Sequence, residues 1–121
     1  MSINTDKLCQ QIKVDLKTGT VVSDTHGEKK GVYQISTAVN GHPSWITRSQ
    51  AIWYIPQLKK WGIGPLESFG SVMYGIWNKY ESVSELPYEI KDWEYLSSLY
   101  GWQPDTVNEI SVTCIDRNFR D

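Results

Sequence analysis

The chain has 121 residues and a net charge of −2, from 12 Lys and Arg against 14 Asp and Glu. A chain of this length fits one domain that buries its own hydrophobic core. Neither sign of charge forms a long run, which argues against binding nucleic acid by phosphate neutralisation. No apolar run approaches the ~20 residues that cross a bilayer, so we expect no membrane insertion.

The N-terminus lacks the basic start and apolar stretch of a signal peptide. We expect a cytoplasmic protein if the chain is full length, and an extracellular one if it is a fragment of a secreted protein. Residues 1–8 are expected to form a flexible N-terminal segment. Residues 9–115 are expected to form a single β domain, followed by a C-terminal tail over residues 116–121.

The first predicted strand covers residues 11–17, where Ile12, Val14 and Leu16 alternate with polar residues. This period of two is typical of a strand with one wet face. The segment 18–31 is rich in glycine and charged residues, and we predict that it is a mobile loop. We expect His26, within that loop, to be in solvent.

An Asn-Gly pair at Asn40 and Gly41 predicts the turn of a β-hairpin, because both residues tolerate the positive φ of a type I′ turn. The two strands are expected at residues 32–39 and 42–47. The pair therefore indicates where the chain reverses and which residues pair beside the turn.

Counting outward from this turn sets an expected register for the hairpin. Val39 faces His42, and Ser36 faces Trp45. This register places Trp45 on the face of the sheet opposite to Ile35. Trp45 is then a surface candidate if that face is uncovered.

A second hairpin is predicted from the strands 51–55 and 60–64, around a turn at residues 56–59. Neighbouring residues of a strand point to opposite faces, so Trp53 and Tyr54 cannot both enter the same core. One of the two is expected at the surface.

Later segments complete an all-β pattern. Further strands are expected at residues 71–77, 92–96 and 109–115, and Gly101 is expected to take a positive φ in the loop between the last two. About eight short strands with turns between them predict an antiparallel meander, folded as a small sandwich or partly closed barrel. No helix of ordinary length is expected, because no window spaces apolar residues at helical intervals between caps.

A series of short aromatic motifs runs through residues 9–114. They are Val39-Asn40-Gly41-His42-Pro43-Ser44-Trp45, Ile52-Trp53-Tyr54, Trp61-Gly62-Ile63-Gly64, Trp93-x-Tyr95, Gly101-Trp102 and a closing Cys114. In order and spacing the series resembles an aromatic-rich β repeat module of uncharacterised protist and invertebrate proteins. The pattern of that module is Val-Asn-Gly-Arg-Pro-x-Tyr, Trp-x-Ile-Gly and a closing Trp and Cys. This chain departs from it at His42 and Trp45, and the resemblance implies a non-catalytic module.

The two cysteines, Cys9 and Cys114, open the first predicted strand and close the last. A bridge between them would close a loop of about 100 residues and pin both ends of the domain. Reduced, partly buried thiols are the alternative, as in cytosolic proteins. The two cysteines and two histidines lack the spacing of a metal site, so no metal or other cofactor is expected.

The sequence contains none of the common catalytic motifs, such as a nucleophile elbow, a phosphate loop or a metalloprotease helix, so no catalytic residue is assigned. The leading hypothesis is therefore a non-catalytic protein-interaction or structural module that uses surface aromatics for recognition. The alternative is a carbohydrate-binding module with an exposed Trp and Tyr platform, and the third is a small enzyme of unknown type. The candidate binding residues are Trp45, Tyr54, Trp77, Tyr80, Tyr100 and Trp102.

These hypotheses predict different surfaces. A glycan platform needs two or three coplanar exposed rings with polar neighbours, whereas a protein interface needs a broader apolar patch. An enzyme needs a deep pocket that holds a titratable group with a displaced pKa.

Overall fold

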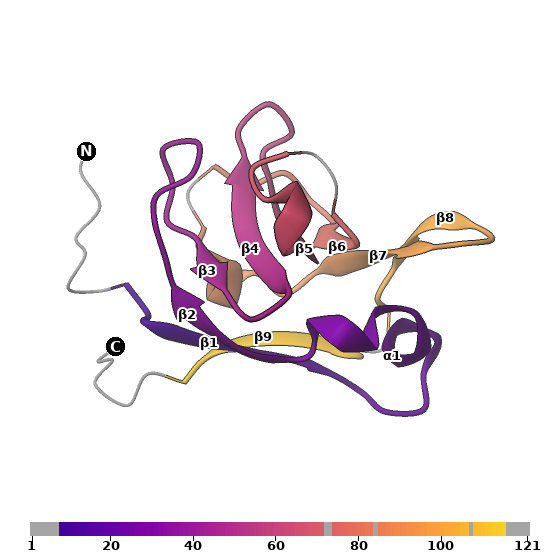
Figure 1. Ribbon diagram of the computed structural model, residues 1–121. Coiled ribbons are helices and arrows are strands. Elements are labelled where there is room, and N and C mark those ends of the chain that lie inside the picture. Colours follow the sequence, from indigo (N-terminus) through magenta and orange to yellow (C-terminus); the bar gives the residue numbers. More distant parts are fainter. Residues whose placement is uncertain (1–7, 72–73, 84, 107, 116–121) are drawn as a thin grey trace.

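The computed structural model describes residues 8–71, 74–83, 85–106 and 108–115, which form one curled antiparallel sheet with a short helix against it (Figure 1). The strands are β1 (Gln11–Leu16), β2 (Gly31–Ile35), β3 (Trp45–Ile46), β4 (Gln50–Ile55), β5 (Lys60–Pro65), β6 (Ile76–Asn78), β7 (Trp93–Ser97), β8 (Gly101–Pro104) and β9 (Ile110–Cys114). The helix is α1 (Val21–His26), and three single 3₁₀ turns are η2 (Gly27–Lys29), η3 (Leu66–Ser68) and η4 (Pro87–Glu89). Residues 1–7 of the segment expected over residues 1–8 lie outside the described residues, as does the tail expected over residues 116–121.

The strands follow one another across the sheet in the order β8-β7-β6-β5-β4-β3-β2-β1-β9. Strand β9 departs from the meander, because it returns to pair with β1. This confirms the all-β antiparallel meander and its partly closed form. The described residues form nine strands, one more than expected, because β8 lies in a stretch for which the sequence predicts a loop.

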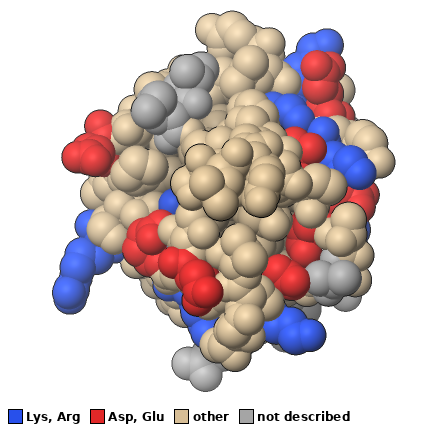
Figure 2. Space-filling view, turned by 90° about the vertical axis from the view of Figure 1, so that its right-hand side faces the viewer, with Lys and Arg blue, Asp and Glu red and all other residues tan. Residues whose placement is uncertain are grey.

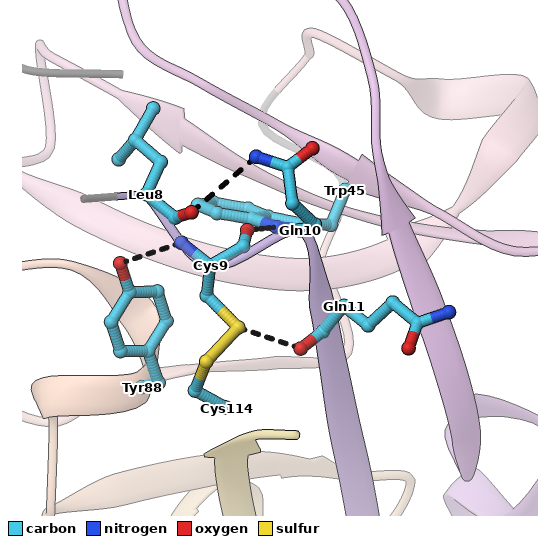
Figure 3. Close-up of a disulfide and its surroundings, with 7 residues drawn as sticks. All are labelled: Leu8, Cys9, Gln10, Gln11, Trp45, Tyr88 and Cys114. Carbon is cyan, nitrogen blue, oxygen red and sulfur yellow. Dashed lines mark hydrogen bonds between the residues drawn. A yellow bond between two sulfur atoms is a disulfide. The ribbon is translucent and has the colours of Figure 1, made fainter. Parts of the chain in front are cut away.

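A disulfide between Cys9 and Cys114 joins the two ends of the domain, with their Cα atoms 5.9 Å apart. Figure 3 shows the bridge below the ring of Trp45 and beside the ring of Tyr88. The indole Nε1–H of Trp45 donates to the carbonyl oxygen of Cys9 at 2.8 Å, and the Cys9 N–H donates to the hydroxyl of Tyr88 at 3.3 Å. The bridge expected as one of two alternatives is therefore the one that the structure contains.

Most of residues 18–31 are helical, in α1 and η2, so the expectation of a loop is wrong. Thr20 caps α1, because its hydroxyl accepts the N–H of Ser23 at 3.1 Å. Val22 and His26 lie one turn apart on the same side of the helix, and both are buried. The expectation that His26 is in solvent is therefore also wrong. A helix of six residues is too short to show a helical period in the sequence, which is why the pattern did not reveal it.

The Asn-Gly turn is confirmed by positive φ angles of 55° at Asn40 and 81° at Gly41, and by paired hydrogen bonds between Val39 and His42. Farther from the turn, the expected register is wrong. Ile35 rather than Ser36 faces Trp45, because residues 36–38 on one arm oppose residues 43–44 on the other. The extra residue is absorbed as a bulge.

This slip of one residue decides where Trp45 lies, since it turns a side chain to the other face of the sheet. Trp45 is completely buried with Tyr33 and has Ile35 packed against the same cluster. Ile46, which was expected to share a face with Ile35, packs against the opposite cluster. Trp45 is therefore a core residue and not a surface candidate.

The larger hydrophobic core fills the inside of the curled sheet and draws residues from strands β1 to β7, from β9 and from α1. It includes the fully buried rings Tyr33, Trp45, Trp61 and Trp93. A smaller core lies on the outer face of β4 and β5, around Trp53 and Tyr74.

Trp53 and Tyr54 are both buried, at 0% and 3% exposure, but in different cores. They point to opposite faces as expected, yet the inference that one reaches the surface is wrong. The segment after β5 folds back over the outer face, where Ser71 accepts the indole N–H of Trp53 at 2.8 Å and Phe69 meets its ring edge-on. Both faces of these strands are therefore covered.

Candidate binding surface

The β7–β8 hairpin extends beyond the rest of the sheet (Figure 1). Its ladder ends at the pair Ser97 and Gly101, and Gly101 has the expected positive φ, 73°. The hydroxyl of Ser97 accepts the N–H groups of Leu99 and Tyr100, both at 3.2 Å. These bonds hold the turn in one shape although it lies outside the core.

Large apolar side chains gather on this hairpin. Leu99 and Tyr100 are 80% and 76% exposed, and Leu96 is 39% exposed. We call Leu96, Leu99, Tyr100 and the half-buried Trp102 the hairpin surface. Figure 2 looks onto the end of the hairpin and shows an uncharged middle, with acidic and basic side chains around it. Exposed apolar residues that lie on one hairpin are candidates for contact with a partner.

A face-to-face pair of indoles lies at the base of the hairpin surface. The rings of Trp77 and Trp102 have centroids 3.8 Å apart and planes within 10° of parallel. The indole N–H of Trp77 donates to the carboxylate of Glu94 at 2.9 Å. Since Trp77 is in β6 and Trp102 in β8, the pair fastens the hairpin across β7 to the body of the sheet.

Lys60 completes this cluster from β5. Its ammonium nitrogen lies 5.0 Å from the centre of the Trp77 ring and donates to the carbonyl oxygens of Asn78 and Lys79 at 2.7 and 3.0 Å. Burial lowers the pKa of Lys60, while the charge of Glu94 acts in the opposite direction. The cation–π contact adds to the fixing of Trp77.

Of the six predicted binding residues, the structure brings Trp77 and Trp102 together, and Tyr100 lies in the turn of the same hairpin as Trp102. Trp45 and Tyr54 are in the core. Tyr80 is 62% exposed, but it follows β6 at the end opposite to the hairpin tip, with the ammonium of Lys79 5.2 Å from its ring.

Leu96 and Leu99 were missed by the sequence analysis. The available signal was the run Leu96-Ser97-Ser98-Leu99-Tyr100, in which large apolar residues continue into a predicted turn. Turn residues are normally small and polar, so an exposed leucine at position 99 departs from the usual composition of a turn.

A second candidate site is a shallow apolar groove beside the Asn-Gly turn, with a volume of about 270 Å³. Among the described residues that line it is His42, whose ring packs on Tyr54 with centroids 4.3 Å apart. Cys9 and Cys114 are both in the disulfide, so neither offers a thiolate to His42.

Within the described residues, no group of three or more His, Cys, Asp or Glu side chains is placed to hold a metal ion. In the same ranges, no helix has the length and hydrophobicity to span a membrane.

Comparison with protein-family models, with curated proteins and with solved structures finds no significant match to this chain. The resemblance to the aromatic-rich β repeat module therefore stays a prediction.

Proposed function

We propose that this protein is a non-catalytic module that binds a protein partner through the hairpin surface. The observation that carries the proposal is the exposure of Leu99 and Tyr100, at 80% and 76%, at the tip of a well-defined hairpin. Aromatic residues that bring a large rigid area and a polar hydroxyl are enriched at protein contacts. An uncharged centre with a charged rim also matches the composition of such interfaces (Figure 2).

The contacts that attach the β7–β8 hairpin to the sheet favour binding without a change in the shape of the hairpin. The indole pair Trp77 and Trp102 attaches the arm to the sheet, and the disulfide closes the domain at the other end. A surface that is already ordered loses less conformational entropy on association than a flexible one.

A glycan platform is less well supported by this geometry. Trp77 and Trp102 stack on each other, so each indole gives one of its faces to its neighbour rather than to a sugar ring. Tyr80 and Tyr100, the most exposed tyrosines, lie at opposite ends of β7. They therefore do not form the adjacent coplanar rings that a sugar platform requires.

The test compares a hairpin variant with a matched control. Leu99→Ser together with Tyr100→Ser removes the apolar tip, whereas Val83→Ser together with Tyr80→Ser removes two residues of similar exposure, 72% and 62%, elsewhere. Tagged proteins are used to capture partners from an extract of the source cells. Captured proteins are identified by mass spectrometry, and affinities are then measured with each purified partner.

We expect a partner that the wild type and the control variant retain and that the hairpin variant binds at least about 30-fold more weakly, as for loss of a hot spot worth about 2 kcal/mol. Equal binding by all three proteins would refute the proposal. Binding to a glycan array that is lost on Trp102→Ala would support the carbohydrate alternative instead.

A further inference from the structure

The helix α1 packs on the sheet where the ladder between β6 and β7 ends. The N–H of Leu96 donates to the carbonyl oxygen of Gly75 at 2.9 Å, but the N–H of Gly75 turns away to the carbonyl of Ile63 in β5. The carbonyl oxygen of Leu96 is instead 2.8 Å from Nε2 of His26. The imidazole N–H of His26 thus takes the place of the backbone N–H of Gly75 as the donor to Leu96.

This contact defines the form of the His26 ring. A carbonyl oxygen only accepts, so Nε2 must carry a hydrogen, and in the neutral ring Nδ1 is then an unprotonated acceptor. Nδ1 is buried and has no hydrogen-bond partner among the described residues. The whole residue is 6% exposed. The neutral tautomer therefore satisfies Leu96 and leaves one buried lone pair, which costs less than a buried N–H.

The surroundings of His26 disfavour a second proton. The charge of Lys29 acts on His26, and Lys29 is 5% exposed and paired with Glu28 at 2.8 Å. From β7, Tyr95 presents its ring edge-on at 6.5 Å. The side chains of His26 and Lys29 pack tightly on Gly75, which precedes β6. A Cβ added at Gly75 would lie 2.8 Å from Cε1 of His26 and 2.7 Å from Cε of Lys29.

Protonation of Nδ1 would therefore place an unpaired N–H and a second positive charge in a closed space. Burial lowers the pKa of His26, and the charge of Lys29 acts in the same direction. The hydrogen bond to Leu96 and the charge of Glu28 oppose this but are outweighed. The folded contact consequently selects the neutral ring.

We propose that His26 is a proton-operated latch, whose neutral ring holds α1 to the root of the β7–β8 hairpin and whose protonation in mildly acidic solution releases it. Leu96 belongs both to the latch and to the hairpin surface, so release would disturb the binding surface. That regulatory consequence rests on the proposed function, whereas the release itself does not.

The sign of the pH dependence follows from linkage. In the released form His26 has its ordinary pKa of 6.5, which is higher than its pKa in the latched form. The latch is therefore fully stable above pH 6.5 and weakens as the pH falls below that value. Its opening equilibrium rises by up to about tenfold for each pH unit in that range.

The experiment follows hydrogen exchange of the Leu96 amide, which is bound to Gly75, and of the α1 amides by NMR. Rates are corrected for the intrinsic pH dependence of exchange. Between about pH 7.5 and about pH 5.5 we expect protection to fall about tenfold in the wild type. The His26→Gln variant keeps a side-chain donor for Leu96 but cannot titrate, so its protection should be flat over this range. His42→Gln, the matched variant of the other histidine, should respond like the wild type.

A wild-type protection that does not change with pH would overturn the latch, as would a pH response that persists in His26→Gln. If His26→Gln does not fold, the ring signals of His26 in the wild type decide the matter. A ring that titrates at or above 6.5 while Leu96 stays protected would refute the proposal. None of these readouts needs a partner, so failure of the latch and failure of the proposed function are separate results.

Discussion

The ring of Tyr74 lies directly on the backbone of Gly62. A Cβ added at Gly62 would be 2.0 Å from Cδ1 of that ring. The hydroxyl of Tyr74 donates to the carbonyl of Trp53 at 3.1 Å, so the ring is held at both ends. The outer core can therefore form only if residue 62 has no side chain.

Gly62→Ala should destabilise the protein by about 2–3 kcal/mol, because Tyr74 must leave its place to admit a methyl group. The measurement is the free energy of unfolding from urea denaturation. Gly27→Ala is the control, since Gly27 has an ordinary helical φ of −56° and nothing within 4 Å of an added Cβ. An equal loss in both variants would contradict the assignment of Tyr74 to this position.

Removing the disulfide should weaken the domain strongly. The bridge joins residues 105 positions apart, and a loop of this length gives a loss of about 2–5 kcal/mol when Cys9 and Cys114 are both changed to alanine. Urea denaturation measures the loss. Alkylation of the native protein without reductant, followed by mass spectrometry, should add no mass, and two adducts would contradict the bridge.

The pair Glu28 and Lys29 should respond asymmetrically to neutralisation. The side chain of Lys29 is 6% exposed and that of Glu28 is 49% exposed. Glu28→Gln leaves a buried ammonium without its carboxylate and should cost about 1–2 kcal/mol, the range for a buried pair reduced for solvent screening. Lys29→Met keeps the apolar stem and should change stability little. A larger loss in Lys29→Met would contradict this account.

The same pair predicts a second acid-sensitive range. Burial alone would raise the pKa of Glu28, but the hydrogen bond and the charge of Lys29 lower it below 4.5. The pair therefore stabilises the fold above pH 4.5 and loses that contribution as the pH falls below it. Glu28→Gln should remove this part of the acid transition in a urea and pH series.

The stacked indoles should show direct coupling in a double-mutant cycle. Trp77→Ala, Trp102→Ala and the double variant are compared by their free energies of unfolding. We expect a coupling of about 0.5–1.5 kcal/mol, the usual value for an aromatic pair beyond its buried area. Additive effects within about 0.3 kcal/mol would show that the stack does not fasten the hairpin.

Local signals in the sequence predicted much of the sheet. The alternation of Ile12, Val14 and Leu16 marked β1, and the Asn-Gly pair marked the reversal at Asn40 and Gly41. The register beyond that turn could not be predicted, because a turn determines only the pairs beside it and a bulge shifts all later ones. That shift alone misplaced Trp45.

The candidate site was predicted only in part, for a different reason. Whether Tyr54 or Trp77 reaches solvent depends on which distant segment covers each face of the sheet. The cover over Trp53 comes from residues after β5, and the buried position of His26 depends on contact with Leu96 in β7. A pattern read along one strand carries no information about such long-range contacts.

Because β9 lies beside β1 and a sulfur–sulfur bond ties their outer ends, a pulling force transmitted along the chain from residue 9 to residue 114 would bypass the sheet. The covalent bridge would bear the load, and the nine strands would stay unstretched. Under tension the domain would therefore keep its length while the disulfide is intact. The strands would unfold under load only after the disulfide is reduced.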